Sequence, residues 1–510
     1  MGRCKICCAD EMIVGRWYKL ITHAVGHGVP YNYTVNYSTE AGNVVLLHDT
    51  VYIKEIGAFT VSCVDQYGNK DTKTITAIEK PSVERTEHTI TPTGWSDFQT
   101  KVTAIGENAL IHVSKGEYAF ELTDADYILP VGTVIDFGGS TINVTSAVTT
   151  YGGLKIYYDF CGIKNGNFVG NMLNDESYVN TSTFISVISG KYAEVENLTF
   201  DGMAGFNLTV GAWPSYWSFQ PYYKNSRWDD SVNYNGYIAD DGSLTASAEA
   251  WTMTEAAEII TTPDRSYYVG RSNMNIPSYV RLFDIAFYDA DMKLLELKKD
   301  CQYYRTYYYP ENAAYVRYCI WQEEEPVNAQ PRDDVCIMRM FGGDDTVQTA
   351  LSVDEAYIAN IAYKNHASGG ISITGKCEEL HIDRMLAKDN GWSNHWAFDA
   401  EDGWNSMLGV VVTHSYFAMG DVVLHGCQGV SLISCICGSV SFKSTVHFPT
   451  IINSLMHTVY GYSLRGCGTI INSYYYRKED SEGYGSVYTF GDRTVEENKA
   501  MRNQIAKHIY

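Results

Sequence analysis

Six short stretches in the last third of the chain repeat one pattern, a β-branched apolar burst closed by a small polar residue. The closing residues come in steps of 23, 30, 21, 19 and 19 residues, and they are Asn360, Asp383, Thr413, Ser434, Asn453 and Asn472. A repeat of about twenty residues built from short strands predicts coils that stack on one another, because one coil alone cannot bury its apolar face. The spacing therefore predicts that the stack itself forms the hydrophobic core.

One step of this repeat is enlarged. The 30-residue step contains Trp392, His395, Trp396 and the run 398–404, which reads FDAEDGW. In stacked repeats, insertions form loops on one face, and surface loops often carry function. We therefore expect functional residues of this chain in the enlarged step.

The composition favours a folded, all-β chain. At 510 residues the chain is long enough for about three domains. A hydrophobic content of 45% with 19% charged residues excludes a disordered chain, and 43 glycines with 40 tyrosines favour β-structure. The net charge of −22 argues against nucleic acid or an anionic membrane as partner, because both attract clustered Lys and Arg.

The cysteines and the chain's apolar stretches give no sign of a metal or a membrane. Thirteen cysteines are spread along the chain, several of them in apolar strands where a reduced thiol is a small core residue. The CxxC of Cys4 and Cys7 has no second CxxC to complete a zinc site, so we predict no metal and no cofactor. No signal peptide and no run of about 18 apolar residues is found. We expect a chain made in the cytoplasm, without membrane insertion, that leaves the cell by a route other than ordinary secretion.

Residues 1–80 predict an N-terminal β-sandwich, because short alternating strands are separated by turn signals. The phrase GAFTV at 57–61, followed by Asp65, Gly68 and Asn69, resembles the last hairpin of bacterial immunoglobulin-like modules. That resemblance implies an immunoglobulin-like domain, and residues 81–92 then form a linker.

Residues 81–210 and 346–476 predict two parts of one coil stack. The first part has a short helix signal at 97–99, followed by strand-like phrases such as 109–113 and 135–142. This order resembles the start of a right-handed parallel β-helix of the pectate-lyase-like kind, which implies that fold for both parts. The corners of such coils need left-handed backbone, which suits Asn and Gly.

Residues 211–345 interrupt the coils with a segment rich in tyrosine and tryptophan. Its phrases IAFYDAD at 285–291 and YPENAAYVR at 309–317 resemble a jelly-roll β-sandwich module common in phage tail and receptor-binding proteins. The resemblance implies an inserted, carbohydrate-binding-like domain. Residues 477–510 are polar, include a helix-compatible run at 494–507, and are expected to form a C-terminal cap or tail.

Asp399, Glu401 and Asp402 are the predicted catalytic residues. Their mutual repulsion raises at least one pKa, and glycoside hydrolysis needs one protonated and one ionised carboxyl group. In an extended strand Asp399 and Glu401 share a face, so the working pair could include Asp421 or Asp383 from a neighbouring coil. The predicted substrate-binding residues, which offer flat rings and polar groups to a sugar, are Trp392, His395, Trp396, Trp404 and Asp421.

Other interpretations of this segment stay open. The carboxylates could bind Ca²⁺ or cap a turn. His395, His414 and His425 surround the segment and could act as bases or as residues of the coil wall. A lyase would need such a base together with a cation for the substrate's carboxylate, and Arg384 and Lys388 are nearby in the sequence. Of the two reactions, the paired carboxylates favour hydrolysis.

Taken together, the repeat and the phrases of the insertion resemble a bacteriophage tail spike or receptor-binding protein. The resemblance implies a homotrimer in the virion that contacts other tail or baseplate proteins and binds a host cell-surface polysaccharide. The NTD, DD, GHG and RIK motifs of polygalacturonase-type hydrolases do not occur in that order, so the resemblance is to a fold. We predict a host-binding spike, with cleavage of the polysaccharide at the acidic run as one option. The alternatives are a non-enzymatic adhesin or structural virion component, and a non-viral polysaccharide hydrolase or lyase.

Overall fold

The computed structural model describes residues 3–25, 35–146, 152–170, 183–203, 205–211, 218–221, 233–253, 256–259, 266–267, 270–271, 283–302, 305, 307–321, 335–336, 338–341, 352–364, 369–388, 396–401, 407–425, 427–442, 449–461, 468–471, 473–480 and 487–490. In this part of the chain nearly every element is a β-strand, and α1 (Trp95–Ile105) is the single helix. No helix in these ranges is both long and apolar enough to cross a membrane. The predicted all-β class is confirmed.

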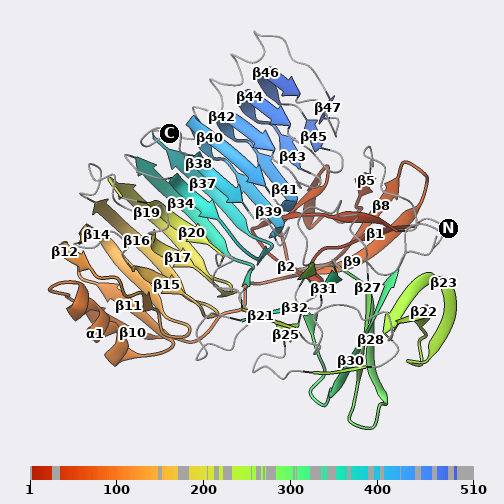
Figure 1. Ribbon diagram of the computed structural model, residues 1–510. Coiled ribbons are helices and arrows are strands. Elements are labelled where there is room, and N and C mark those ends of the chain that lie inside the picture. Colours follow the sequence, from red (N-terminus) through yellow and green to blue (C-terminus); the bar gives the residue numbers. More distant parts are fainter. Residues whose placement is uncertain are drawn as a thin grey trace.

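The main body is one parallel sheet, which contains 26 strands among the described residues (Figure 1). Its first strands are β10 (Thr86–Ile90), β11 (Ala109–Val113), β12 (Glu117–Leu122), β13 (Tyr127–Ile128), β14 (Val134–Ser146), β15 (Leu154–Ile156), β16 (Gly162–Gly170), β17 (Thr183–Val187), β18 (Gly190–Lys191), β19 (Glu194–Asp201) and β20 (Phe206–Val210). After an interruption it continues with β33 (Val353–Asp354), β34 (Tyr357–Lys364), β35 (Gly369–Ile373), β36 (Cys377–Glu378), β37 (His381–Ala387), β38 (Trp396–Glu401), β39 (Met407–Thr413), β40 (Tyr416–His425), β41 (Cys427–Ile433), β42 (Ile436–Phe442), β43 (Thr450–Ile452), β44 (Leu455–Gly461), β45 (Gly468–Ile471), β46 (Tyr474–Asp480) and β47 (Val487–Phe490). Strands pair with their counterparts one coil further on, as β34 does with β37 and β39 with β41, so we call this body the coil stack.

The repeat found in the sequence is the coil period of this stack. At one corner of successive coils the residues have a left-handed backbone with positive φ, and they are Asn165, Asn197, Asn360, Arg384, His414, Ser434 and Asn453. The predicted closing residues Asn360, Ser434 and Asn453 lie at this corner. Asp383 and Thr413 lie one residue too early, because the chain turns at Arg384 and His414, and Asn472 is outside the described residues.

The coils enclose one continuous hydrophobic core. Val195, Ile358 and Ile382 are fully buried and pair in register from coil to coil, which is how each coil covers the apolar face of the next. Helix α1 closes the first end of the stack by burying Trp95 and Phe98 against the coils. The short helix expected from the sequence is therefore present, and it is longer than the signal at 97–99.

The N-terminal segment, residues 3–78, forms sheets around a core of its own. Its strands are β1 (Arg3–Ile6), β2 (Glu11–Ile13), β3 (Trp17–Lys19), β4 (Thr22–Val25), β5 (Val35–Ser38), β6 (Val44–Leu47), β7 (Thr50–Ile53), β8 (Gly57–Asp65) and β9 (Lys70–Ile78). One sheet has the order β2-β9-β8-β5 and another the order β3-β7-β6. The β8–β9 hairpin turns where Asp65 accepts backbone hydrogen bonds from Tyr67 and Asn69, as an Asx turn requires.

The inserted segment, residues 218–341, leaves the coil stack after β20 and returns before β33. Its strands are β21 (Ser218–Pro221), β22 (Asn233–Ile238), β23 (Leu244–Met253), β24 (Ala257–Glu258), β25 (Ser266–Tyr267), β26 (Gly270–Arg271), β27 (Phe283–Tyr288), β28 (Leu294–Cys301), β29 (Tyr307–Tyr308), β30 (Tyr315–Trp321), β31 (Val335–Cys336) and β32 (Met338–Phe341). The largest of its antiparallel sheets has the order β22-β23-β30-β27-β28, with β24 beside β30. Because β19 pairs directly with β34, the coil stack continues in register across the insertion.

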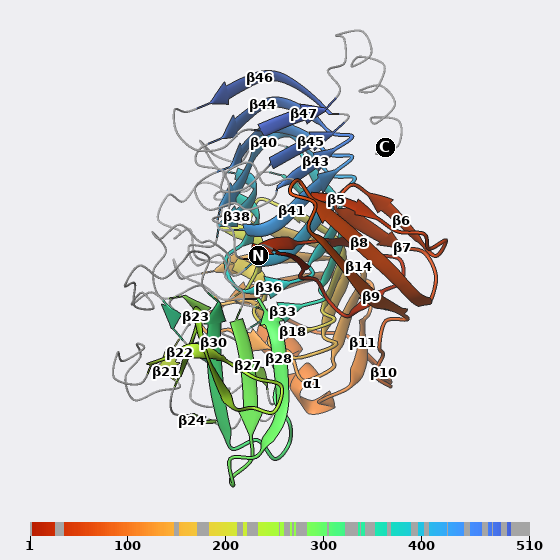
Figure 2. The same ribbon diagram turned by 90° about the vertical axis from the view of Figure 1, so that its right-hand side faces the viewer.

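Both segments lie against one flank of the coil stack, the N-terminal segment in red and the inserted segment in green (Figures 1 and 2). Strand β3 lies along β39 and β41. Lys19 Nζ donates to Thr450 Oγ1 at 2.6 Å, and Thr50 Oγ1 lies 2.9 Å from Ser431 Oγ, so polar contacts fix this docking.

Candidate functional site

Two of the predicted site residues lie on neighbouring strands and on one face of the coil stack. Asp399 on β38 pairs in register with Val423 of β40, two residues beyond Asp421. Since side chains two residues apart on a strand point the same way, both carboxylates face outward from the same sheet. They differ in environment, because Asp421 is exposed and Asp399 is only 3% exposed.

The remaining predicted residues are placed in part. Trp396 and Glu401 lie on β38, opposite Asp421 and His425 in register. The others lie outside the described residues, and they are Trp392, His395, Asp402 and Trp404. Asp383, the other suggested partner of Asp399, lies on β37, in register with Ala359 and with Thr413. Catalysis at the acidic run therefore stays a prediction.

Asp399 belongs to a row of buried polar side chains that sequence analysis did not predict. In register along the sheet, this row consists of Lys155, Ser186, Thr209, Ser372 and Asp399, all of them buried. Lys155 and Thr209 each donate to Ser186 Oγ at 2.8 Å, and Ser372 donates to Asp399 Oδ2 at 3.4 Å. Hydrogen bonds within the row thus join side chains of neighbouring coils, and one of them holds Oδ2 of Asp399.

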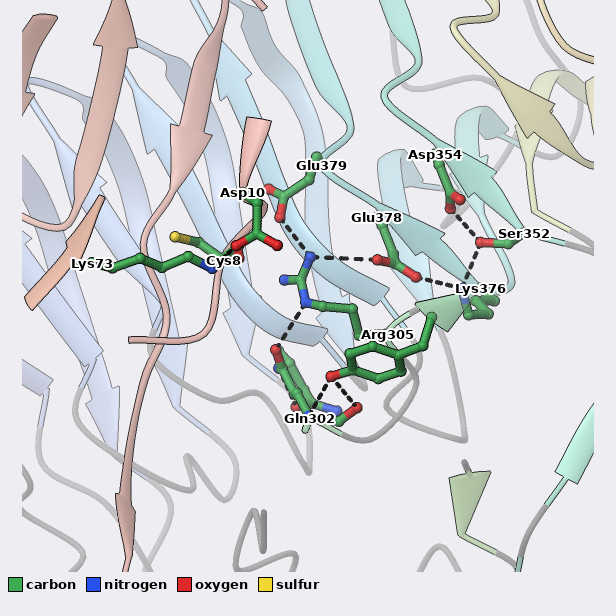
Figure 3. A network of polar contacts seen from close by, with 12 residues as sticks. Cys8, Asp10, Lys73, Gln302, Arg305, Ser352, Asp354, Lys376, Glu378 and Glu379 are labelled. Atoms are coloured by element: carbon green, nitrogen blue, oxygen red, sulfur yellow. Dashed lines mark hydrogen bonds and ion pairs between the residues drawn. The ribbon is translucent and has the colours of Figure 1, made fainter. Parts of the chain in front are cut away.

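A second cluster lies where the inserted segment meets the coil stack (Figure 3). Arg305 places Nη1 3.1 Å from Glu379 Oε1 and 3.4 Å from Glu378 Oε2. On the far side of Glu378, Lys376 donates to Oε1 of this carboxylate and to Ser352 Oγ, each at 2.6 Å. Buried ion pairs of this kind fix one docking geometry, because a shifted segment would leave charges without partners. We call this cluster the junction.

The N-terminal segment contacts the same edge of the stack. Tyr18 donates its hydroxyl to Glu355 Oε2 at 2.8 Å, and Arg16 donates to the Glu355 carbonyl at 2.5 Å. Burial, together with the nearby charge of Glu379, raises the pKa of Glu355 to about 8. Burial also raises the pKa of Glu379, although the charge of Arg305 opposes it. The stack thus holds carboxylates that are hard to ionise under two docked segments.

A third cluster, which we call the corner cluster, lies at the exposed corner of the enlarged coil. Asp383 Oδ1 accepts hydrogen bonds from Thr413 Oγ1 at 2.7 Å and from His414 Nδ1 at 2.9 Å. Asp383 Oδ2 lies 3.1 Å from Nη1 of Arg384. Burial would raise the pKa of Asp383, but the hydrogen bonds from His414 and Thr413 and the charge of Arg384 hold it below its ordinary value. Asp383 is therefore an ionised carboxylate at neutral pH.

His381 supports this cluster from the covered side. Its Nε2 lies 3.1 Å from Thr413 Oγ1, and burial lowers its pKa to about 3, so its ring is neutral. Its ring centroid lies 5.3 Å from that of Tyr357, over which Arg16 of the N-terminal segment is stacked at 5.3 Å. Asp383 is 6% exposed, whereas the side chains of Arg384 and His414 are more than half exposed. The cluster is thus buried on the side of Asp383 and His381, and it exposes the polar side chains of Arg384 and His414 to solvent.

This surface combines the His414–Asp383 pair, which can transfer a proton, with the cationic side chain of Arg384. A His–Asp pair can accept or deliver a proton, and a guanidinium can bind a carboxylate or a phosphate. Among the described residues, no group of three or more His, Cys, Asp or Glu side chains is placed to hold a metal ion.

Comparisons of the chain with protein-family models, with curated proteins and with solved structures give no match. The class of the protein therefore has to be argued from its own fold and sites.

Sequence analysis named Asp383 as a possible partner of Asp399, His414 as a possible base and Arg384 as a nearby cation, but it did not place the three together. The available signal was the long step itself, since Arg384 and His414 are the two corner residues that begin and end it. What the sequence could not show is that these two residues from successive coils meet at one carboxylate.

Proposed function

We propose that this chain is a receptor-binding spike of the bacteriophage tail kind, which binds a polysaccharide of a host cell surface. The observation that carries the proposal is the exposed polar corner of the coil stack, which presents Asn197, Asn360, Arg384 and His414 on a fixed scaffold. Extended sugar chains bind through hydrogen bonds to hydroxyl groups, and a row of side chains repeated at the coil spacing matches a repeating polymer.

The finer description of the fold belongs to the same proposal. We take the coil stack as a right-handed parallel β-helix of the pectate-lyase-like kind. The four-stranded and three-stranded N-terminal sheets around one core support an immunoglobulin-like domain. The antiparallel sheets of the inserted segment support a jelly-roll module. In this interpretation the spike is a homotrimer in the virion, attached to other tail or baseplate proteins.

Cleavage at the acidic run is the enzymatic version of the proposal. Asp421 is exposed and can reach a polymer, while Asp399 is buried in its polar row and would have to act from beneath the surface. A non-enzymatic adhesin uses the same exposed corner without bond cleavage.

The test incubates purified full-length protein with a panel of bacterial surface polysaccharides. Retention of the polymer, fragment size and new reducing or unsaturated ends are measured for the wild type and for Asp399→Asn, Glu401→Gln and Asp402→Asn. Retention of at least one polymer is the expected result. Cleavage that is lost in one folded variant would locate hydrolysis at the acidic run, and a wild type that retains no polymer would refute the proposal.

A further inference from the structure

Two free thiols meet in the core of the N-terminal segment. Cys4 on β1 and Cys63 on β8 place their Sγ atoms 3.6 Å apart, although 59 residues separate them along the chain. Both side chains belong to the hydrophobic core of this segment, and they are 3% and 1% exposed. A disulfide bond is about 2.05 Å long, so a small rotation of two side chains already in contact brings the sulfur atoms together.

The two thiols come from different sheets. Strand β1 pairs with β4 in a two-stranded sheet, whereas β8 lies inside the sheet of order β2-β9-β8-β5. Cys63 is therefore held by strands on both sides, while β1 is the first strand of the chain and reaches the larger sheet through side chains. One such contact is the hydrogen bond from Ile6 N to Asp71 Oδ2, at 2.7 Å. A covalent bond between Cys4 and Cys63 would join the two sheets through their shared core.

Strand β1 also contacts the inserted segment. Lys5 Nζ lies 3.9 Å from Asp300 Oδ2 on β28. Directly after β1, Cys7 N donates to Ile21 O at 2.7 Å, which holds the chain against the N-terminal segment. Strand β1 thus lies between the core of the N-terminal segment and the edge of the inserted segment. Whatever fixes β1 also fixes this contact.

The closed fold protects the two thiols from reaction. Burial raises the pKa of Cys4 to about 12 and also raises the pKa of Cys63, and a protonated thiol is a poor nucleophile. Terminal strands open more easily than the centre of a sheet, and β1 has a single partner strand. Opening of β1 exposes both sulfur atoms, and its return brings them into contact again. Reaction with an oxidant therefore depends on the opening of one strand.

We propose that Cys4 and Cys63 form a disulfide bond when the chain meets an oxidising medium, and that this bond locks β1 in place. The oxidant is a small-molecule disulfide. One cysteine thiolate attacks it, forms a mixed disulfide and displaces one small thiol. The second thiolate then attacks the cysteine sulfur of the mixed disulfide and displaces the other small thiol. The two cysteines lose two electrons and two protons, and the small disulfide takes up both. The inference does not depend on the binding of a polysaccharide.

The experiment compares the full-length chain after dithiothreitol with the chain after oxidised glutathione at pH 8. The 13 cysteines should give 13 free thiols in denaturant after reduction, and two fewer after oxidation. Trypsin cuts after Arg3 and Lys5, which separates Cys4 from Cys7, so mass spectrometry of the unreduced digest identifies the linked pair. Closing a loop of this length should raise the melting temperature by several degrees and slow proteolysis within residues 3–78 at least 10-fold.

The variants are Cys4→Ala and Cys63→Ala, with Cys161→Ala as the matched control. Cys161 is equally buried, but its Sγ donates to the Pro130 carbonyl at 3.3 Å, in the coil stack. The control should keep the difference between oxidised and reduced protein, and the other two variants should lose it. The linked peptide is measured on the wild type, so this result stands even if a variant folds poorly.

A peptide pair that links Cys4 to Cys63, together with slower proteolysis of the oxidised wild type, would support the inference. Thirteen free thiols after oxidation would overturn it, as would a bond between Cys4 and Cys7. A linked pair that leaves both the melting temperature and proteolysis unchanged would overturn the locking of β1. A difference between oxidised and reduced protein that persists in Cys4→Ala would also count against it, because the effect would then come from other cysteines.

Discussion

The coil stack has two left-handed corners that share a backbone and differ in their side chains. The open corner carries Asn on four of the described coils, and three of these amides, Asn165, Asn197 and Asn360, bond to one another along the stack. The covered corner lies under the docked segments, and its residues are Phe160, Tyr192, Glu355, Glu379, Gly409 and Gly429, with φ between 52 and 79°. At the covered corner Glu355 and Glu379 bond to Tyr18 and Arg305 of the docked segments.

Both corners require a left-handed backbone, but the residue type at each corner depends on whether the corner faces water or a docked segment. In water, Asn satisfies a left-handed corner with its own amide, and the next coil supplies the partner. Under a docked segment the corner residue finds its hydrogen-bond partner in that segment. A carboxylate is therefore suitable at the corner where a cation or a hydroxyl group of the segment lies close. Glycine serves where the segment's own atoms come close, because an added Cβ at Gly429 would lie 2.8 Å from Ile21 Cγ1.

The largest loss of stability is expected from removing Arg305, the cation that pairs with the carboxylates of the covered corner. Arg305→Met leaves Glu378 and Glu379 buried opposite an apolar group, which should destabilise docking of the inserted segment by about 3–5 kcal/mol. Chemical denaturation with limited proteolysis of the inserted segment measures it. The control is Lys101→Met, which removes the surface pair Lys101–Asp97 and should change stability by less than about 1 kcal/mol. Equal effects from both variants would show that the junction is no stronger than a surface pair.

Close approach at the covered corner is tested with a pair of glycines. Gly429→Ala combines a left-handed alanine, about 1–2 kcal/mol, with overlap against Ile21 and Lys19, about 1–3 kcal/mol. Gly139→Ala has a similar φ of 72° with nothing within 4 Å of the added atom, so it shows the backbone effect alone. Melting temperatures of the two variants, compared with the wild type, should separate by several degrees. If they coincide, the N-terminal segment does not seat on Gly429 in solution.

The two corners also show how far sequence can be taken. The coil period was predictable from Asn360 onward, since a β-branched burst and a polar closing residue recur there in successive coils. Its register was wrong by one residue at Asp383 and Thr413, because each is the polar residue that directly follows the apolar burst, whereas the left-handed turn comes one residue later, at Arg384 and His414.

The covered corner and the polar row could not be predicted. Glu355 and Glu379 look like surface residues in the sequence, and their partners Tyr18 and Arg305 lie far away along the chain. Asp399 is predicted to be catalytic because it stands among carboxylates and tryptophans in the sequence. Its place in register with Ser372 and Thr209 depends on the pairing of successive coils, which the sequence does not reveal.

The pH dependence of the covered corner is expected to differ from that of the open one. The pKa of Glu355, raised to about 8 in the folded chain, lies above that of an unfolded glutamate near 4.5. Its contribution is therefore fully present below about pH 4.5 and is lost as the pH rises through about 8. Glu355→Gln should match the wild type at pH 5 and exceed it by on the order of 2 kcal/mol at pH 9. The exposed Glu121→Gln is the control in denaturation curves at both pH values. A Glu355→Gln advantage that does not grow with pH would contradict the raised pKa.

The smallest effect is expected at the open corner, where water can replace what a mutation removes. Asn360→Gly keeps the left-handed turn but removes the bonds to Asn197 and Arg384, which should destabilise the chain by roughly 1 kcal/mol. Asn360→Ala loses the same bonds and adds the strain of a left-handed alanine, for a total of roughly 2–3 kcal/mol. Denaturation midpoints of the two variants separate the contribution of the amide hydrogen bonds from the strain of the left-handed turn. Asn360 is also where the amide ladder holds Arg384, so equal stabilities of the wild type and Asn360→Gly would mean that the ladder only orients that arginine and adds nothing to the stack.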